Sequence, residues 1–193
     1  MKEIEIKVEV SARHIHLSKE DKEKLFGKGY KLQPLRWLSQ PKLFAAKETV
    51  ALKIGDKVIE NVRIVGPERE KTQVEISLTD AFFFKIFPPI KVSGDISGTP
   101  GAVLIAPNGN QVEIKEGVIV PQRHIHASPK EAKELGLSQG DIVSVKIEGK
   151  RGLIFDNVVV RVKEGFSLAM HIDTDEGNAA GIPKGGKGKI ILP

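Results

Sequence analysis

The chain lacks cysteine, is poor in aromatic residues and has no long apolar run. Without cysteine there is no disulfide and no thiolate metal site, so any transition metal must be held by imidazole and carboxylate groups. No segment approaches the roughly 18 apolar residues of a membrane span, and the first seven residues alternate charged and apolar side chains instead of forming a signal core. We therefore expect a cytoplasmic protein without a membrane partner. The five histidines are the first candidates for metal ligands.

Basic residues outnumber acidic ones, 30 to 25, which gives a formal charge of +5. This balance suits an anionic partner such as a nucleotide or phosphate, although the two signs are interspersed as on an ordinary solvated surface. One tryptophan, one tyrosine and no arginine-rich run argue against a nucleic-acid partner. With 40% hydrophobic residues over 193 positions, the chain can bury the core of one large domain or two small ones.

An internal repeat organises the chain. The segment Arg13–Ser18 recurs as Arg123–Ser128, with five of six positions identical. Each copy follows a strand-like apolar stretch. Further on, Asn61 and Asn157 open similar strand segments, and 14 residues beyond each asparagine stand Glu75 and His171, respectively. The repeat therefore makes Glu75 and His171 equivalent positions.

Helix signals follow both copies of the repeated motif. Ser18 and Ser128 are in N-cap positions, and the second has proline at the first helical position and glutamate for a capping box. Gly27 and Gly136 are placed to end these short helices. Short strands and frequent turns elsewhere predict a mainly β fold of two related small barrels or sandwiches with a few short helices. Residues 28–47 are an insertion in the first half, and residues 94–120 are expected to form a bridging segment with a hairpin turn at Asn108-Gly109.

Two histidine pairs lie within the repeat. Residues two apart in a strand face the same side, so the histidines of each pair project together while the isoleucine between them faces away. Glu75 and His171 then offer a third donor to each pair. Three protein ligands with an open position are typical of a catalytic zinc. The two predicted ligand sets are His14, His16 and Glu75, and His124, His126 and His171.

Other interpretations of these residues stay open. The repeat also fits a duplicated structural turn in which the histidines cap neighbouring helices, and Glu75 also fits the solvent side of an alternating strand. Asp173, two residues beyond His171, fits either an acceptor that orients that imidazole or a helix N-cap.

At these residues the chain resembles the phosphate propanoyltransferase family, the PduL-type phosphotransacylases, over nearly its whole length. The resemblance rests on the segments Val10–Ser18, Leu38–Pro41, Phe44–Ala46, Asn61–Arg69, Thr72–Ser77, Ser93–Asp95, Arg123–His126 and Arg151–Ala180.

The resemblance implies a pair of small β-barrels capped by short α-helices, with a site for two Zn2+ ions between them held by the two ligand sets above. It implies reversible transfer of a short acyl group, propanoyl or acetyl, between coenzyme A and inorganic phosphate. The family's catalytic, phosphate-contacting arginine falls on Arg69, which without the resemblance fits a loop arginine balanced by its glutamate neighbours. One barrel would comprise residues 1–12 with 121–193, and the other residues 13–93.

The chain departs from the family pattern at few places. Lys47 stands where an acidic residue is more usual, and residues 81–91 are rich in phenylalanine, which suits an acyl pocket, a barrel core or an oligomer contact. The chain begins close to the first strand, so we expect a free cytoplasmic enzyme over the alternative, a microcompartment lumen protein of propanediol degradation. A homo-oligomer is left open.

Two rival functions compete with acyl transfer. A two-zinc hydrolase of esters or phosphoesters also fits histidine pairs with a carboxylate, since metal-activated water would serve it. A non-catalytic metal-binding module is the other.

Overall fold

The computed structural model describes residues 3–192, and the chain divides into two compact units. Unit 1 combines the residues up to Ala12 with those from Gln122 onward, and unit 2 is Arg13–Pro121. Each unit has an apolar core of its own. No helix among the described residues is both long and apolar enough to cross a membrane.

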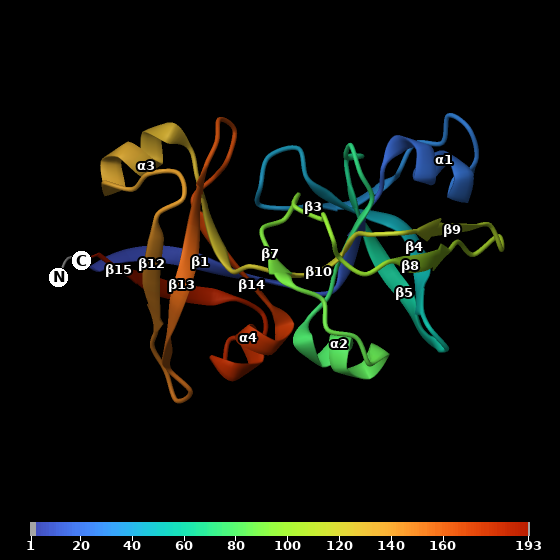
Figure 1. The fold of residues 1–193 in the computed structure, drawn as a ribbon. Coiled ribbons are helices and arrows are strands. Elements are labelled where there is room, and N and C mark those ends of the chain that lie inside the picture. The colour runs from blue at the N-terminus through green and yellow to red at the C-terminus, as the bar shows by residue number, and fades with distance from the viewer. Residues whose placement is uncertain (1–2, 193) are drawn as a thin grey trace. The chain divides into compact units, whose positions relative to one another are not determined.

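Unit 1 is a closed barrel with strand order β1-β14-β11-β13-β12-β15 (Figure 1). Two short helices, α3 (Pro129–Leu135) and α4 (Thr174–Ala179), follow the antiparallel strands β11 and β14 and lie at opposite ends of the barrel (Figure 1). The barrel strands are β1 (Glu3–Ser11), β11 (His124–Ala127), β12 (Ile142–Ile147), β13 (Leu153–Val162), β14 (Ala169–Asp173) and β15 (Gly186–Ile191).

Unit 2 is a nine-stranded sheet whose main path is β7-β10-β6-β2-β5-β4-β8-β9, with β3 paired to β4. Helix α1 (Lys19–Phe26) follows β2, and α2 (Leu78–Phe84) follows β6. The strands are β2 (His14–His16), β3 (Pro34–Trp37), β4 (Phe44–Ile54), β5 (Lys57–Gly66), β6 (Gln73–Glu75), β7 (Ile90–Lys91), β8 (Ala102–Ile105), β9 (Gln111–Ile114) and β10 (Val118–Pro121).

The two units share one strand order. The run β10-β6-β2-β5-β4-β8 in unit 2 corresponds to β1-β14-β11-β13-β12-β15 in unit 1. The units differ at the edge, because β15 pairs with β1 and closes the ring, whereas β8 pairs with β9. The predicted mainly β fold with short helices is confirmed, with a closed ring of strands in unit 1 and a sheet in unit 2.

The inserted and connecting segments of unit 2 are built into its sheet. Residues 28–47 supply β3 and the start of β4, and residues 94–120, for which we expect a bridging role, supply β8, β9 and most of β10. The predicted hairpin turn is confirmed: Gly109 has a φ of 88°, and Ala106 N–H donates to the carbonyl of Asn110 between β8 and β9.

Two asparagines bend long strands at equivalent places. Asn61 in β5 and Asn157 in β13 have φ values of 58° and 55°, a left-handed conformation that asparagine tolerates better than most residues. At these points the pairing of β5 with β4 and of β13 with β12 shifts register. Such bulges re-aim a strand. Beyond the bulge, β5 and β13 pair in parallel with the histidine strands β2 and β11.

Side-chain caps set the ends of the helices that follow β2, β11 and β14, the strands that carry predicted ligands. Ser18 Oγ accepts from Asp21 N–H at the start of α1, and Ser128 forms a capping box with Glu131 at α3, as predicted. Asp173 is the N-cap of α4, which is one of the two roles anticipated for it. Gly136 ends α3 with a φ of 72°, a conformation in which a side chain is strained.

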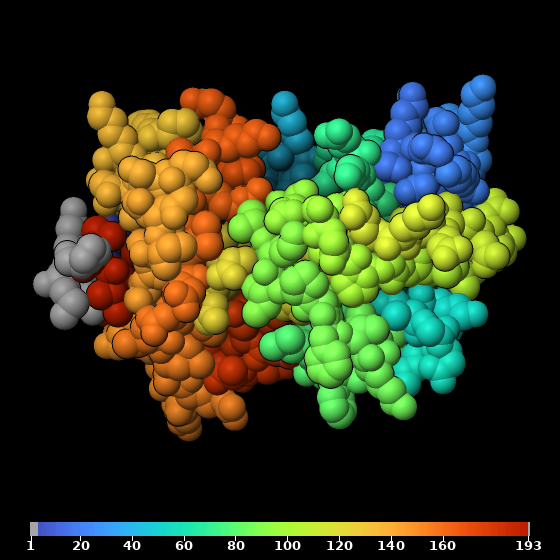
Figure 2. All heavy atoms as spheres, in the orientation of Figure 1, coloured from blue at the N-terminus to red at the C-terminus, as the bar shows by residue number. Residues whose placement is uncertain are grey.

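The phenylalanine-rich segment is divided between core and surface. Phe84 is buried in the core of unit 2, whereas Phe82 and Phe87 are 86% and 98% exposed. Figure 2 shows α2 and the residues after it at the surface of unit 2. A role in the core therefore explains only some of the phenylalanines of this segment.

Candidate metal centres

The first candidate centre lies on neighbouring strands of unit 2. In the antiparallel pair β2–β6, His14 lies opposite Glu75. The two histidine Nε2 atoms are 3.2 Å apart, and Glu75 oxygens lie 3.5 Å from His14 Nε2 and 3.9 Å from His16 Nε2. Among residues 3–192, this trio alone forms a group of three potential ligands with all ligand atoms within 4.8 Å of one another.

The isoleucines between the paired histidines face away from them, as predicted. Ile15 and Ile125 are fully buried in the cores of their units. Alternation along a strand then sets both histidines of each pair on the other side. The apolar core thereby fixes the direction in which the imidazoles point.

A backbone carbonyl sets the orientation of His16. Its Nδ1 lies 3.1 Å from the Val65 oxygen, and because a carbonyl can only accept, Nδ1 carries the proton. Nε2 is then left with a lone pair on the side of Glu75. Burial, ahead of the neighbouring charges of His14 and Arg69, holds the pKa of His16 well below its ordinary value. The imidazole is thus neutral at pH 7, the form that binds metals.

Polar neighbours hold the carboxylate of Glu75. Its Oε1 accepts from Ser93 Oγ at 2.7 Å and from Gln73 Nε2 at 2.6 Å. Gln73 is itself fixed, since its Oε1 accepts from Gly94 N–H. Burial alone would raise the pKa of Glu75, but the two histidines, Ser93 and Arg69 outweigh it and lower the pKa to about 2. The group is therefore an anion at neutral pH.

Arg69 is joined to this centre through one hydroxyl. Its Nη1 donates to Ser93 Oγ at 2.9 Å, and the same hydroxyl donates to Glu75. The backbone of Arg69 is anchored too, because its N–H donates to the carbonyl of Leu17 just beyond β2. Glu68, the neighbour expected to balance Arg69 in a plain surface loop, instead forms an ion pair with Lys22.

The second candidate centre occupies the equivalent strands of unit 1. In the antiparallel pair β11–β14, His124 lies opposite His171, as His14 lies opposite Glu75. The rings of His124 and His126 have centroids 4.5 Å apart, and those of His171 lie 5.4 and 4.8 Å from them. The ligand atoms are spread more widely than in unit 2, but all three predicted residues gather at one place.

His124 has the same kind of backbone anchor as His16. Its Nδ1 lies 2.8 Å from the Gln122 carbonyl oxygen, which again assigns the proton to Nδ1 and leaves Nε2 as a ligand atom. Such a fixed tautomer is usual for metal-bound histidine. Imidazole groups, joined in the first centre by a carboxylate, fit a borderline metal such as zinc, so the donor chemistry of the two centres suits the ion that the resemblance implies.

The structure rejects the alternative in which the histidines serve as helix caps. The four described helices are capped by Ser18, Ser77, Ser128 and Asp173. Glu75 is 6% exposed, which also excludes the solvent side of a strand for it. The histidines and Glu75 are thus available for another role.

Several residues of the sites escaped sequence analysis. Ser93 and Gln73 lie in segments that carry the family resemblance, but no role was predicted for either. Gln73 contacts Glu75 two residues along β6, and Ser93 contacts it from a loop 18 residues away in sequence. Arg13 and Arg123, by contrast, stand within the repeated motif. Each forms an ion pair with the capping acid of a helix in its own unit, Asp80 and Glu176, respectively.

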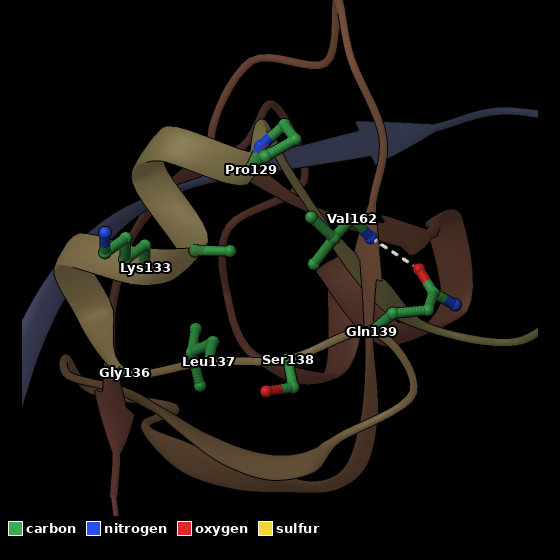
Figure 3. A pocket seen from close by; sticks show the side chains of 8 residues that line it. Pro129, Lys133, Gly136, Leu137, Ser138, Gln139 and Val162 are labelled. Carbon is green, nitrogen blue, oxygen red and sulfur yellow. Dashed lines mark hydrogen bonds between the residues drawn. The ribbon is translucent and has the colours of Figure 1, made fainter.

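A surface hollow of about 590 Å3 lies elsewhere in unit 1. Its lining comes from α3, the turn after it and the end of β13 (Figure 3). Gln139 Oε1 accepts from Val162 N–H at 2.7 Å across this hollow. The lining contains no histidine and no carboxylate, so the hollow offers none of the donors that a catalytic metal needs.

Comparison with known proteins agrees with this geometry. The sequence profile of the phosphate propanoyltransferase family matches residues 7–183. A phosphate propanoyltransferase of Thermotoga maritima is 56% identical over 181 residues, which cover 93% of this chain and 85% of the relative. Those of Listeria monocytogenes and Salmonella typhimurium are 50% and 51% identical, covering 96% and 94% of this chain and 87% and 86% of the relatives. The chain belongs to the phosphate propanoyltransferase family.

Proposed function

We propose that this enzyme reversibly transfers a short acyl group, propanoyl or acetyl, between coenzyme A and inorganic phosphate, with Zn2+ at each of two centres. Membership of the family makes the chain an acyltransferase. The observation that carries the proposal is the compact group of His14, His16 and Glu75, with Arg69 joined to it through Ser93.

The ligand roles follow from the arrangement of each unit. His14, His16 and Glu75 would hold one ion, and His124, His126 and His171 the other. Bound zinc would act as a Lewis acid that offsets negative charge on the thioester carbonyl oxygen and on the departing thiolate. The backbone carbonyls of Val65 and Gln122 keep the imidazoles in the tautomer that this role needs.

Arg69 would position phosphate. A guanidinium offers two parallel N–H donors to phosphate oxygens, and Ser93 holds this one beside the carboxylate of Glu75. A phosphate oxygen forms a bond to the thioester carbonyl carbon, and the carbon–sulfur bond breaks with its electron pair leaving on sulfur. The products are an acyl phosphate and the coenzyme A thiolate.

Direct transfer without an acyl-enzyme agrees with the chain's own groups. There is no cysteine to form a thioester. The Ser93 hydroxyl donates to Glu75 and accepts from Arg69 and Gln73, so its donor and both lone pairs are engaged in holding other side chains. We expect sequential kinetics with both substrates bound together.

Release of coenzyme A with and without phosphate tests the proposal. Acetyl-, propanoyl- and butanoyl-coenzyme A would be compared, with zinc content measured on the same protein. We expect release that depends on phosphate, acyl phosphate as product and about two zinc ions per chain. Release that ignores phosphate would indicate the two-zinc hydrolase, and bound metal without turnover of any acyl-coenzyme A would indicate the metal-binding module.

A further inference from the structure

Glu9 stands in the same cross-strand row as the histidines of the second centre. In the parallel pair β1–β14, Glu9 lies opposite His171, which in turn lies opposite His124 across β11–β14. Residues opposite one another on neighbouring strands project from the same face of a sheet. The row Glu9–His171–His124 therefore places a carboxylate directly beside His171, with His124 on the next strand.

The distance between Glu9 and His171 agrees with a shared metal ion. Glu9 Oε2 lies 3.7 Å from His171 Nε2. In the first centre the separations between ligand atoms run from 3.2 to 3.9 Å. Ligands about 2.1 Å from a tetrahedral zinc ion lie roughly 3.4 Å from each other, so the Glu9–His171 separation is that of two ligands on one ion.

The repeat shows that this carboxylate is particular to one unit. The equivalent row in unit 2 is Ile119–Glu75–His14, with Ile119 fully buried. Unit 2 thus carries its carboxylate at the middle position of the row, and unit 1 carries one at the outer position, where β1 supplies Glu9. Each centre would then have a single anionic donor to offset the charge of a divalent ion.

We propose that Glu9 supplies a carboxylate ligand to the centre of His124, His126 and His171, where substrate would enter a fifth position. The inference rests on the proposed function, because it assumes a metal at that centre. Glu9 is partly buried, and its other oxygen, Oε1, pairs with Lys7 Nζ at 2.5 Å, which leaves Oε2 nearer His171. Lys7 holds the carboxylate in place from the solvent side.

Cobalt titration of a protein with the first centre removed tests this proposal. The background is the full chain with His14→Ala and His16→Ala, stripped of metal, so that bound Co2+ reports on unit 1. We expect Glu9→Gln to weaken Co2+ binding at least tenfold and to change the visible absorption of the bound ion, because the ligand set loses a carboxylate. Competition with a chelator measures the affinity.

Glu5→Gln is the matched control, since Glu5 lies on the same strand and pairs with Lys187 on β15. It removes the same charge, and we expect Co2+ affinity within twofold of the background. If Glu9→Gln behaves like Glu5→Gln while the background binds Co2+, Glu9 only forms an ion pair with Lys7, and this inference alone is wrong. If the background binds no Co2+ at all, the second centre of the proposed function fails, and this inference with it.

Discussion

Arg13 donates from Nε and Nη2 to a single oxygen of Asp80, at 2.9 and 2.6 Å. Arg13 immediately precedes the histidine strand β2, and Asp80 forms the capping box with Ser77 at the start of the helix that follows β6, the strand of Glu75. Arg123 and Glu176 form the equivalent ion pair in unit 1, between β11 and the helix that follows β14. In each unit this contact links the strands that carry the proposed ligands.

Asp80→Ala is expected to destabilise unit 2 by about 1–3 kcal/mol, because it removes the acid of the capping box and the partner of Arg13 together. Asp80 is 4% exposed, so water can replace few of the hydrogen bonds that the substitution removes. Urea denaturation followed by circular dichroism measures the change. Glu60→Ala, an exposed acid on β5, is the control and should stay within about 0.5 kcal/mol of the parent. Equal stability of the two variants would show that the contact does not brace the unit.

Glu176 should make the metal-free protein less stable as the pH rises. Burial outweighs the opposing charge of Arg123 and raises the pKa of Glu176 from 4.5 to about 7, so between these values the folded protein holds a proton that the unfolded chain has lost. The slope of the unfolding free energy is then negative across this window, and about 3 kcal/mol is lost by pH 8. Glu176→Gln keeps a capping side chain but cannot titrate. Relative to the parent, its stability should therefore improve from pH 4.5 to pH 8 by a similar amount.

Glu131→Gln provides the control for this pH dependence, because Glu131 fills the same position in the capping box of α3. Burial opposes it, but hydrogen bonds from Ser128 lower the pKa of Glu131 below 4.5. Above pH 4.5 its carboxyl is ionised whether folded or unfolded, so the difference from the parent should stay flat between pH 5 and pH 8. If the stability difference from the parent changed with pH in the same way for both variants, the raised pKa of Glu176 would be contradicted.

The repeat accounts for what could be predicted from the sequence. Side-chain alternation placed the histidine pairs, and counting from Asn61 and Asn157 reached the partners that the strands place opposite them, Glu75 and His171. Serine and glycine signals gave the ends of α1 and α3. All of these patterns are local or recur in the other half of the chain, so aligning the two halves was enough to find them.

Contacts between segments distant in sequence could not be predicted in this way. Glu9 reaches His171 only because β1 pairs with β14, and Ser93 reaches Glu75 from a loop 18 residues away, where no local pattern indicates the contact. The closure of unit 1 depends on β15 pairing with β1, and the apolar alternation of either strand leaves its partner unspecified. The asparagine bulges were missed because a single residue at positive φ leaves no periodic signal.

His171→Ala is expected to remove about one of two zinc ions per chain and most of the activity. The fold should persist, because the barrel core is built from the apolar side chains on the other face of the strands. Elemental analysis and circular dichroism on one sample separate these effects. His124→Ala should behave alike, whereas His14→Ala should remove the other ion. Full metal content with full activity in His171→Ala would refute the ligand assignment in unit 1.

Ser93→Ala should loosen the first centre while leaving its three ligands in place. The variant removes the hydroxyl that joins Arg69 to Glu75, so we expect roughly tenfold weaker zinc binding there and a higher KM for phosphate. Ser97→Ala, an exposed serine on the same loop, is the control. Unchanged zinc affinity and KM in Ser93→Ala would mean that Glu75 and Arg69 are held by other contacts.

Arg69→Ala should lower kcat/KM at least a hundredfold while zinc content stays near that of the parent, because the residue is proposed to hold phosphate and is not a ligand. Arg69→Lys keeps the charge but loses the planar pair of donors, so it should recover only part of the activity, with KM for phosphate raised more than KM for acyl-coenzyme A. Arg63→Lys is the control, since Arg63 also lies in unit 2 but donates to the carbonyls of Ala46 and Lys47. Phosphate-dependent turnover at the parental rate in Arg69→Ala, or loss of its zinc, would show that Arg69 has a different role.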